Sequence, residues 1–155
     1  AFNKMKYKKK KFYLVGPITG PTGIDLYSLP ANIIYLGVLK GPKLREIYNS
    51  VSAFVLPSLE EGLALVQGEA LNASLPLITT KNTGGEDLIK NGLEGFIVNP
   101  GSLEELHNCF VNLSEDIALR RKMRLAAHEN SLRNSGWDKS VNSLINKLQN
   151  IEKLN

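Results

Sequence analysis

Short apolar runs alternate along the chain with longer segments in which apolar residues recur at helical spacing. Five of the short runs are rich in β-branched or aromatic residues and are bounded by Gly or Pro, which is typical of buried strands. These predicted strands are Phe12–Gly16, Ile33–Gly37, Ala53–Pro57, Pro76–Thr80 and Gly95–Val98.

Segments with helical periodicity separate these strands and continue beyond the last one. The predicted helices are Lys43–Asn49, Leu63–Ala73, Glu86–Asn91, Ser102–Leu113, Glu115–Asn134 and Asp138–Leu154. Continuous apolar strands that alternate with helices indicate a parallel sheet covered on both faces. The sequence therefore predicts an α/β fold with a doubly wound, Rossmann-like sheet. With 155 residues and 43% hydrophobic composition, we expect a single domain over residues 1–155.

Composition and charge narrow the classes of function. The formal net charge of +4 suits an anionic ligand but is too small for a nucleic-acid-binding arm, so we expect no nucleic-acid partner. The single cysteine, Cys109, excludes an internal disulfide framework. No apolar run reaches the roughly 18 residues of a membrane span, and no signal-peptide pattern is present, so we expect a cytoplasmic location. The start, AFNKMKYKKKKFYLVG, has no initiator methionine and resembles the end of a helix, so we expect a fragment of a longer protein.

Four loops with the composition of ligand-binding turns fall at one edge of the predicted sheet. In a parallel sheet, ligands bind at the carboxyl ends of the strands, where helix N-termini point. The loops at this edge are Gly16–Gly23, Gly37–Pro42, Ser58–Gly62 and Lys81–Asp87. Glycine lets the backbone approach a ligand, and free N–H groups at helix N-termini favour phosphate. Each loop alone is compatible with ordinary turn chemistry, but four together favour a ligand site.

Two acidic residues flank the start of the second predicted helix. Glu61 lies ahead of its first turn and Glu69 lies nearly two turns into it, so their backbones are separated by roughly 12 Å along the helix axis. Carboxylates suit pairs of sugar hydroxyls, and the N–H groups of residues 62–65 would face a diphosphate between them. From spacing alone, the alternative that both glutamates are solvated surface groups stays open.

The same residues carry a resemblance to a family. The segment AFVLPSLEEGLALVQGEALNASLPLITTKNTGGEDLIKNGLEGFIVNPGSLEEL resembles the C-terminal, donor-binding domain of the retaining GT-B glycosyltransferases of glycosyltransferase family 4, the glycosyl transferases group 1. The matching signature is a strand ending in Pro-Ser followed by E-x7-E, here Pro57, Ser58, Glu61 and Glu69. A glycine-rich segment follows at Gly84, Gly92, Gly95 and Gly101. The resemblance implies a Rossmann-like domain that binds a nucleoside-diphosphate sugar.

The resemblance also implies roles for individual residues. Glu61 would contact the hydroxyls of the transferred sugar as the catalytic residue, and Glu69 would bind the nucleotide ribose. The backbone that follows the first glutamate would lie against the sugar and the phosphates, at Gly62, Leu63, Ala64 and Leu65. The loops after the first two strands would border the nucleotide, at Gly16 and at Val38 or Leu39. Many relatives have Phe-Gly or Phe-Pro in place of Leu63-Ala64, so the donor sugar stays open.

Parts that the family requires are absent from the sequence. A cationic Arg and Lys that neutralise the leaving diphosphate, the first strand of this domain and an N-terminal acceptor domain would all precede residue 1. We therefore expect the fragment alone to be inactive. In the longer protein, the acceptor would be a glycan or lipid-linked molecule of the type used in bacterial cell-surface polysaccharide or lipopolysaccharide assembly. The resemblance implies metal-independent chemistry without a cofactor, and a cytoplasmic protein that associates with the inner face of the membrane.

Two functional alternatives remain beside the transferase. A nucleotide-binding module without transfer activity would have the same residues, and only upstream sequence would distinguish it. A receiver-like signalling domain would need acidic residues at the strand ends, where this chain has Gly, Pro and Thr. The first alternative is kept and the second is set aside.

Overall fold

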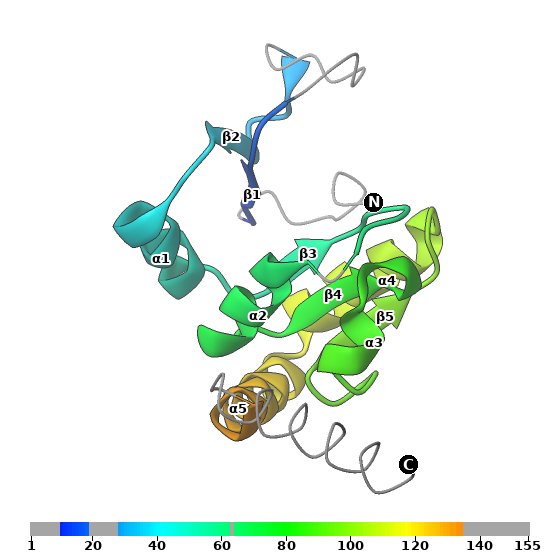
Figure 1. Ribbon diagram of the computed structural model, residues 1–155. Coiled ribbons are helices and arrows are strands. Elements are labelled where there is room, and N and C mark those ends of the chain that lie inside the picture. Colours follow the sequence, from blue (N-terminus) through cyan, green and yellow to red (C-terminus); the bar gives the residue numbers. More distant parts are fainter. Residues whose placement is uncertain (1–9, 19–27, 63, 135–155) are drawn as a thin grey trace, which may run out of the picture.

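A computed structural model describes residues 10–18, 28–62 and 64–134 (Figure 1). The strands are β1 (Phe12–Val15), β2 (Ile33–Gly37), β3 (Phe54–Leu56), β4 (Leu77–Thr80) and β5 (Gly95–Val98). The helices are α1 (Gly41–Ser50), α2 (Leu65–Asn72), the 3-10 turn η3 (Lys81–Thr83), α3 (Gly85–Leu88), α4 (Leu103–Glu115) and α5 (Ile117–Asn134). All predicted strands and the first five predicted helices are confirmed, with small shifts at their ends. The predicted helix Asp138–Leu154 lies outside the described residues.

The strands form two parallel sheets. β1 pairs with β2, while β3, β4 and β5 pair in that order with β4 at the centre. Figure 1 shows the β1–β2 pair standing apart from the three-stranded sheet. The predicted α/β fold with parallel strands is confirmed, but the expected single sheet is interrupted between β1 and β3. Among the described residues no strand lies between these two to continue the ladder.

Helices cover both faces of the three-stranded sheet, because successive residues of a strand point to opposite sides. Leu77 of β4 lies in a cluster on the side of α1, α2 and α5, whose buried members are Tyr48, Ala70, Leu71, Leu75, Leu77, Ile89 and Ala127. The next residue, Ile78, lies in a second cluster on the side of α4, whose buried members are Ile78, Val98, Cys109, Phe110, Leu113 and Met123. α5 contributes to both clusters and so joins the two layers.

The two-stranded sheet shares the α4 layer with the larger one. The ring of Phe12 in β1 meets the ring of Phe110 edge-on, with centroids 5.9 Å apart. Val55 of β3 packs against the same cluster. β1 and β3 therefore rest on one helical layer although no hydrogen-bonded ladder joins them.

β5 approaches β4 closely at a glycine. A Cβ atom on Gly95 would lie 2.0 Å from the backbone oxygen of Leu77, far inside van der Waals contact. Any larger residue at this position would push the two strands apart. Gly95 is thus required by the packing of β5 against β4.

Candidate functional site

The loop between β3 and α2 is fastened to the end of β4 and to η3. The hydroxyl of Thr80 donates to the carbonyl of Ser58 at 2.6 Å, and the side-chain amide of Asn82 donates to the carbonyl of Leu59 at 2.9 Å. In return, the backbone N–H of Glu61 donates to the carbonyl of Asn82 at 2.9 Å. Three hydrogen bonds therefore fix the backbone of this loop at the carboxyl edge of the sheet.

Glu61 projects from this fastened loop as an exposed side chain. The hydroxyl of Ser58 donates to its Oε2 atom at 3.0 Å. This bond limits the directions in which the carboxylate can point while it still leaves acceptor capacity on both oxygens. Glu61 is thus an exposed but oriented acceptor.

Helix α2 begins at Leu65, two residues later than the sequence predicted. Ala64 precedes it with an extended backbone, and its side chain is buried at 6% exposure. No side-chain hydrogen bond caps the helix start. The N–H of Gln67 donates to the carbonyl of Ala64, so the N–H groups of Leu65 and Val66 are those suited to an external acceptor such as a phosphate oxygen. Gly62 is exposed in the loop, and Leu63 lies outside the described residues.

A buried network of polar side chains holds α2 against β4. The amide nitrogen of Gln67 donates to the carbonyl of Thr83 at 2.7 Å, and its amide oxygen accepts from the hydroxyl of Thr79 at 2.7 Å. The Thr83 hydroxyl lies within hydrogen-bond distance of the Thr79 hydroxyl and donates to the carbonyl of Thr80. Gln67, Thr79 and Thr83 each have 0% exposure, so the network lies entirely in the interior.

Glu69 faces a hollow between α1 and α2. The hydroxyl of Tyr48 donates to Oε2 of Glu69 at 3.1 Å. Burial raises the pKa of Tyr48, and the neighbouring charge of Glu69 raises it further, so the phenol stays protonated as a donor. The hollow has a volume of about 410 Å³ and is lined by Gly41, Leu44, Arg45, Tyr48, Asn49, Glu69, Asn72 and Ala73.

The two remaining predicted positions, Gly16 and Leu39, lie in the loops that follow the strands of the smaller sheet. Gly16 follows β1 with a φ of +136°, and its carbonyl accepts a hydrogen bond from the hydroxyl of Tyr35 at 2.9 Å. Leu39 is half-buried in the loop after β2, whereas Val38 beside it is exposed. The structure thus brings Glu61 to Ser58 and Asn82, and Glu69 to Tyr48. None of the described hydrogen bonds joins Gly16 or Leu39 to either glutamate.

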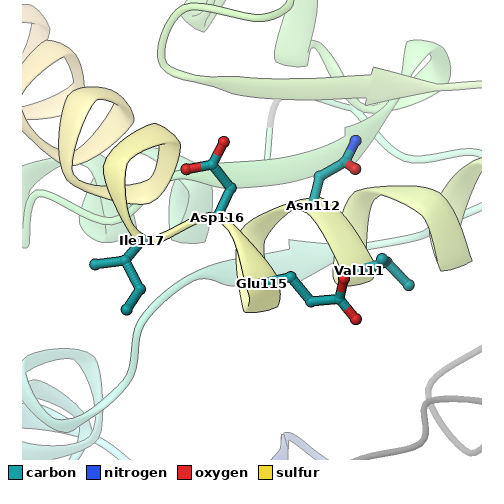
Figure 2. Close-up of a pocket in the computed structure, with 5 residues that line it drawn as sticks. All are labelled: Val111, Asn112, Glu115, Asp116 and Ile117. Carbon is teal, nitrogen blue, oxygen red and sulfur yellow. The ribbon is translucent and has the colours of Figure 1, made fainter.

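A second hollow, of about 490 Å³, lies at the turn between α4 and α5 (Figure 2). Its lining residues are Val111, Asn112, Glu115, Asp116 and Ile117. In Figure 2 the carboxylates of Glu115 and Asp116 point in different directions, so they do not converge on one ligand atom. This hollow contains none of the residues that the sequence predicted for the site.

Metal ligands, membrane spans and reactive thiols are the remaining candidate features of residues 10–18, 28–62 and 64–134. In these ranges no group of three or more His, Cys, Asp or Glu side chains is placed to hold a metal ion. No described helix is long and apolar enough to span a membrane. Burial raises the pKa of Cys109 to about 11, so this thiol stays protonated and packs as an apolar side chain.

Comparison with known proteins identifies the family. The family model described as glycosyl transferases group 1 matches residues 1–116. The chain belongs to this family. Among the group 1 glycosyltransferase relatives, a sulfoquinovosyl transferase of Arabidopsis thaliana is 34% identical over 115 residues, which are 71% of this chain and 22% of that protein. The capsular polysaccharide biosynthesis glycosyltransferase CapM of Staphylococcus aureus is 38% identical over 73 residues, which are 47% of this chain and 19% of that protein.

The fold of this group 1 glycosyltransferase chain agrees with solved structures. The crystal structure of Anabaena HepE in complex with UDP matches 93% of this chain and 42% of HepE, with a TM-score of 0.78 and 18% identity. HepE was also crystallised with UDP-glucose. The GT-B, Rossmann-like fold implied by the sequence is confirmed. The chain spans only about a fifth of the length of the two curated relatives.

Several residues around the glutamates were missed by sequence reasoning. Tyr48 holds the carboxylate of Glu69, Gln67 and Thr79 hold α2 in place, and Asn82 holds the loop that carries Glu61. The threonine pair at the end of β4 was an available signal, because two buried hydroxyls need partners.

Proposed function

We propose that this chain is the donor-binding half of a retaining GT-B glycosyltransferase, which transfers a sugar from a nucleoside-diphosphate sugar to a glycan or lipid-linked acceptor. The observation that carries the proposal is the pair of carboxylates on either side of the uncapped start of α2, each accepting a hydrogen bond from a hydroxyl side chain. Membership of the group 1 family supports it, as does the structural likeness to HepE, which binds UDP and UDP-glucose.

The donor nucleotide would be held through three kinds of contact. Glu69 accepts hydrogen bonds from the ribose hydroxyls, for which a carboxylate is well suited. The first N–H groups of α2 donate to the diphosphate, which the positive end of the helix dipole also favours. The loops at Gly16 and Leu39 border the rest of the nucleotide.

Glu61 would act on the sugar. Its carboxylate accepts hydrogen bonds from the sugar hydroxyls, and Ser58 holds it in place for this contact. The anomeric carbon gains positive charge as the diphosphate departs, and a nearby carboxylate stabilises that charge more strongly in the transition state than in the ground state. Glu61 would therefore contribute mainly to the rate of transfer.

The acceptor would be bound by a part of a longer protein. Support comes from the share of the relatives' length that this chain spans and from the interrupted sheet. A further parallel strand between β1 and β3 would pair with both and join the two sheets above α4. CapM, a capsular polysaccharide glycosyltransferase, favours an acceptor of the cell-surface polysaccharide type. We place the longer protein in the cytoplasm, at the inner face of the membrane, and its transfer needs no metal or other cofactor.

The proposal is tested by calorimetric titration of the chain with UDP, GDP and ADP and with their glucose conjugates, in EDTA and in Mg²⁺. At least one nucleotide should bind in the millimolar range or tighter, equally well in both buffers. Glu69→Gln should weaken the free nucleotide and the nucleotide sugar alike, by about 1–3 kcal/mol for a hydrogen bond to a charged group. Glu61→Gln should weaken only the nucleotide sugar.

The exposed neighbour Glu60 provides a matched control, since Glu60→Gln removes the same charge one residue away. Equal losses of nucleotide affinity in the Glu61 and Glu69 variants would contradict the division of roles. Absence of binding to every nucleotide would refute the proposed function. Binding without transfer in a longer protein that also contains an acceptor domain would favour the alternative, a non-catalytic nucleotide-binding module.

A further inference from the structure

Tyr48 links the core of the fold to an exposed carboxylate of the candidate site. Its ring lies in the interior with 7% of its surface exposed, and it packs against Phe54 of β3 with ring centroids 6.1 Å apart. Its hydroxyl emerges beside the exposed carboxylate of Glu69 and donates to it at 3.1 Å. The buried Tyr48 is thus a rigid donor, and the exposed Glu69 side chain is the flexible acceptor.

The direction of this bond is fixed by the surroundings of the phenol. Burial and the adjacent negative charge both disfavour the phenolate, so Tyr48 donates over the whole physiological pH range. In the part of the chain that the structure describes, the Glu69 carboxylate accepts a hydrogen bond from the side chain of Tyr48. A glutamate on a helix surface otherwise samples several rotamers, and each immobilised rotamer costs binding free energy when a ligand needs one of them.

We propose that Tyr48 is a positioning residue for nucleotide binding. It holds Oε2 of Glu69 at the hollow between α1 and α2, so that the remaining acceptor positions of the carboxylate are directed at the two ribose hydroxyls of the donor. This inference rests on the proposed function, because it takes Glu69 as the ribose ligand. It adds α1 to the binding site, since α1 carries Tyr48 and lines the hollow.

The binding of two related ligands distinguishes a positioning role of Tyr48 from a merely structural one. UDP presents both ribose hydroxyls, whereas 2′,3′-dideoxy-UDP keeps the base and the diphosphate but presents neither. If Tyr48 acts through Glu69 on these hydroxyls, Tyr48→Phe should weaken UDP about 3- to 10-fold and leave dideoxy-UDP unchanged. The ratio of the two affinities does not depend on the fraction of folded protein, so it stays informative if the variant is less stable.

Two further variants complete the experiment. Tyr13→Phe removes a hydroxyl from a half-buried tyrosine of β1 outside the hollow and should leave the ratio as in the parent chain. In a Glu69→Gln background, Tyr48→Phe should change UDP affinity less than twofold, because the two residues act through one contact.

The outcomes separate the inference from the proposed function. A UDP to dideoxy-UDP ratio that falls with Glu69→Gln but not with Tyr48→Phe overturns the positioning role and leaves the proposed function standing. Equal weakening of both ligands by Tyr48→Phe also overturns it, since the residue then acts on the fold. A parent chain that binds neither UDP nor GDP nor ADP overturns both.

Discussion

The buried network of Gln67, Thr79 and Thr83 allows a sharp prediction for Thr79→Val. Valine has nearly the shape of threonine, so the substitution creates no cavity and removes only the hydroxyl. The amide oxygen of Gln67 then loses the donor that reaches it at 2.7 Å, in a site with 0% exposure. An unsatisfied buried acceptor costs about 1–3 kcal/mol, whereas Thr83 keeps its bond to the carbonyl of Thr80.

The expected loss is therefore about 2 kcal/mol in the free energy of unfolding. For a chain of 155 residues this corresponds to a decrease of roughly 4–8 °C in Tm. Thermal melts followed by circular dichroism, with urea titrations at 25 °C, would measure both quantities.

Thr80→Val is the matched comparison, because the same change is made one residue further along β4. The hydroxyl of Thr80 donates to the carbonyl of Ser58 in a partly exposed loop. When this hydroxyl is removed, a water molecule can donate to that carbonyl in its place. We expect a cost of about 0.5–1.5 kcal/mol there. The reasoning is wrong if Thr79→Val is neutral or costs no more than Thr80→Val. In addition, Thr79→Val combined with Gln67→Leu should cost less than the sum of the two single changes, because both single changes break the same Thr79–Gln67 hydrogen bond. The carbonyl of Thr83 loses its donor in the Gln67 single variant and in the double variant alike.

Three further predictions concern other parts of the molecule. Gly95→Ala should destabilise the chain by about 3 kcal/mol or more in urea titrations, because its Cβ atom would overlap the backbone of Leu77. Asn82→Ala removes one of the three hydrogen bonds that hold the loop of Glu61, so it should weaken the binding of UDP-glucose about threefold relative to that of UDP in calorimetry. Hydrogen bonds from Asn99 lower the pKa of Glu105, so this carboxylate stabilises the fold above its unfolded pKa and loses that contribution as the pH falls. Glu105→Gln should accordingly flatten the decline of Tm below about pH 5.

The positions of the strands along the chain could be predicted from the sequence because their signals are local. β4 is the clearest case, since Leu77, Ile78, Thr79 and Thr80 are all nearly inaccessible and form a continuous apolar or β-branched run. Pro and Gly mark where such runs stop. The placement of Glu61 in a loop and Glu69 on a helix followed from the same local rules.

The interruption of the sheet could not be predicted in this way. Apolar runs show that a segment is a strand, but they do not show which strand lies beside it. The pairing of β3 with β4 and the absence of a ladder between β1 and β3 are non-local. The late start of α2 has a different cause, because Ala64 keeps an extended backbone and buries its side chain at 6% exposure. Tertiary packing here overrides the helical tendency of the segment.

The contacts that orient the glutamates could not be predicted from the sequence either. Tyr48 and Glu69 are 21 residues apart and come from different helices, so their meeting depends on how α1 and α2 are rotated about their axes. Periodicity fixes which face of a helix is buried, but a hydrogen bond between two rim residues needs the rotation to within a fraction of one residue. Asn82 and Leu59 are 23 residues apart, so their hydrogen bond likewise depends on non-local packing.

The separation between the two carboxylates depends on how α2 is held, as well as on the hydrogen-bond partners of each glutamate. The loop of Glu61 is fastened to η3, and Glu69 is held by α1, so the two are anchored to different parts of the fold. Gln67 lies between them in sequence and binds β4 and η3 from within α2. In the proposed function one extended donor meets both carboxylates, and the buried amide of Gln67 then contributes to the span between them, because it fixes α2 against β4 and η3. A residue with no access to solvent thereby contributes to the geometry of an exposed site.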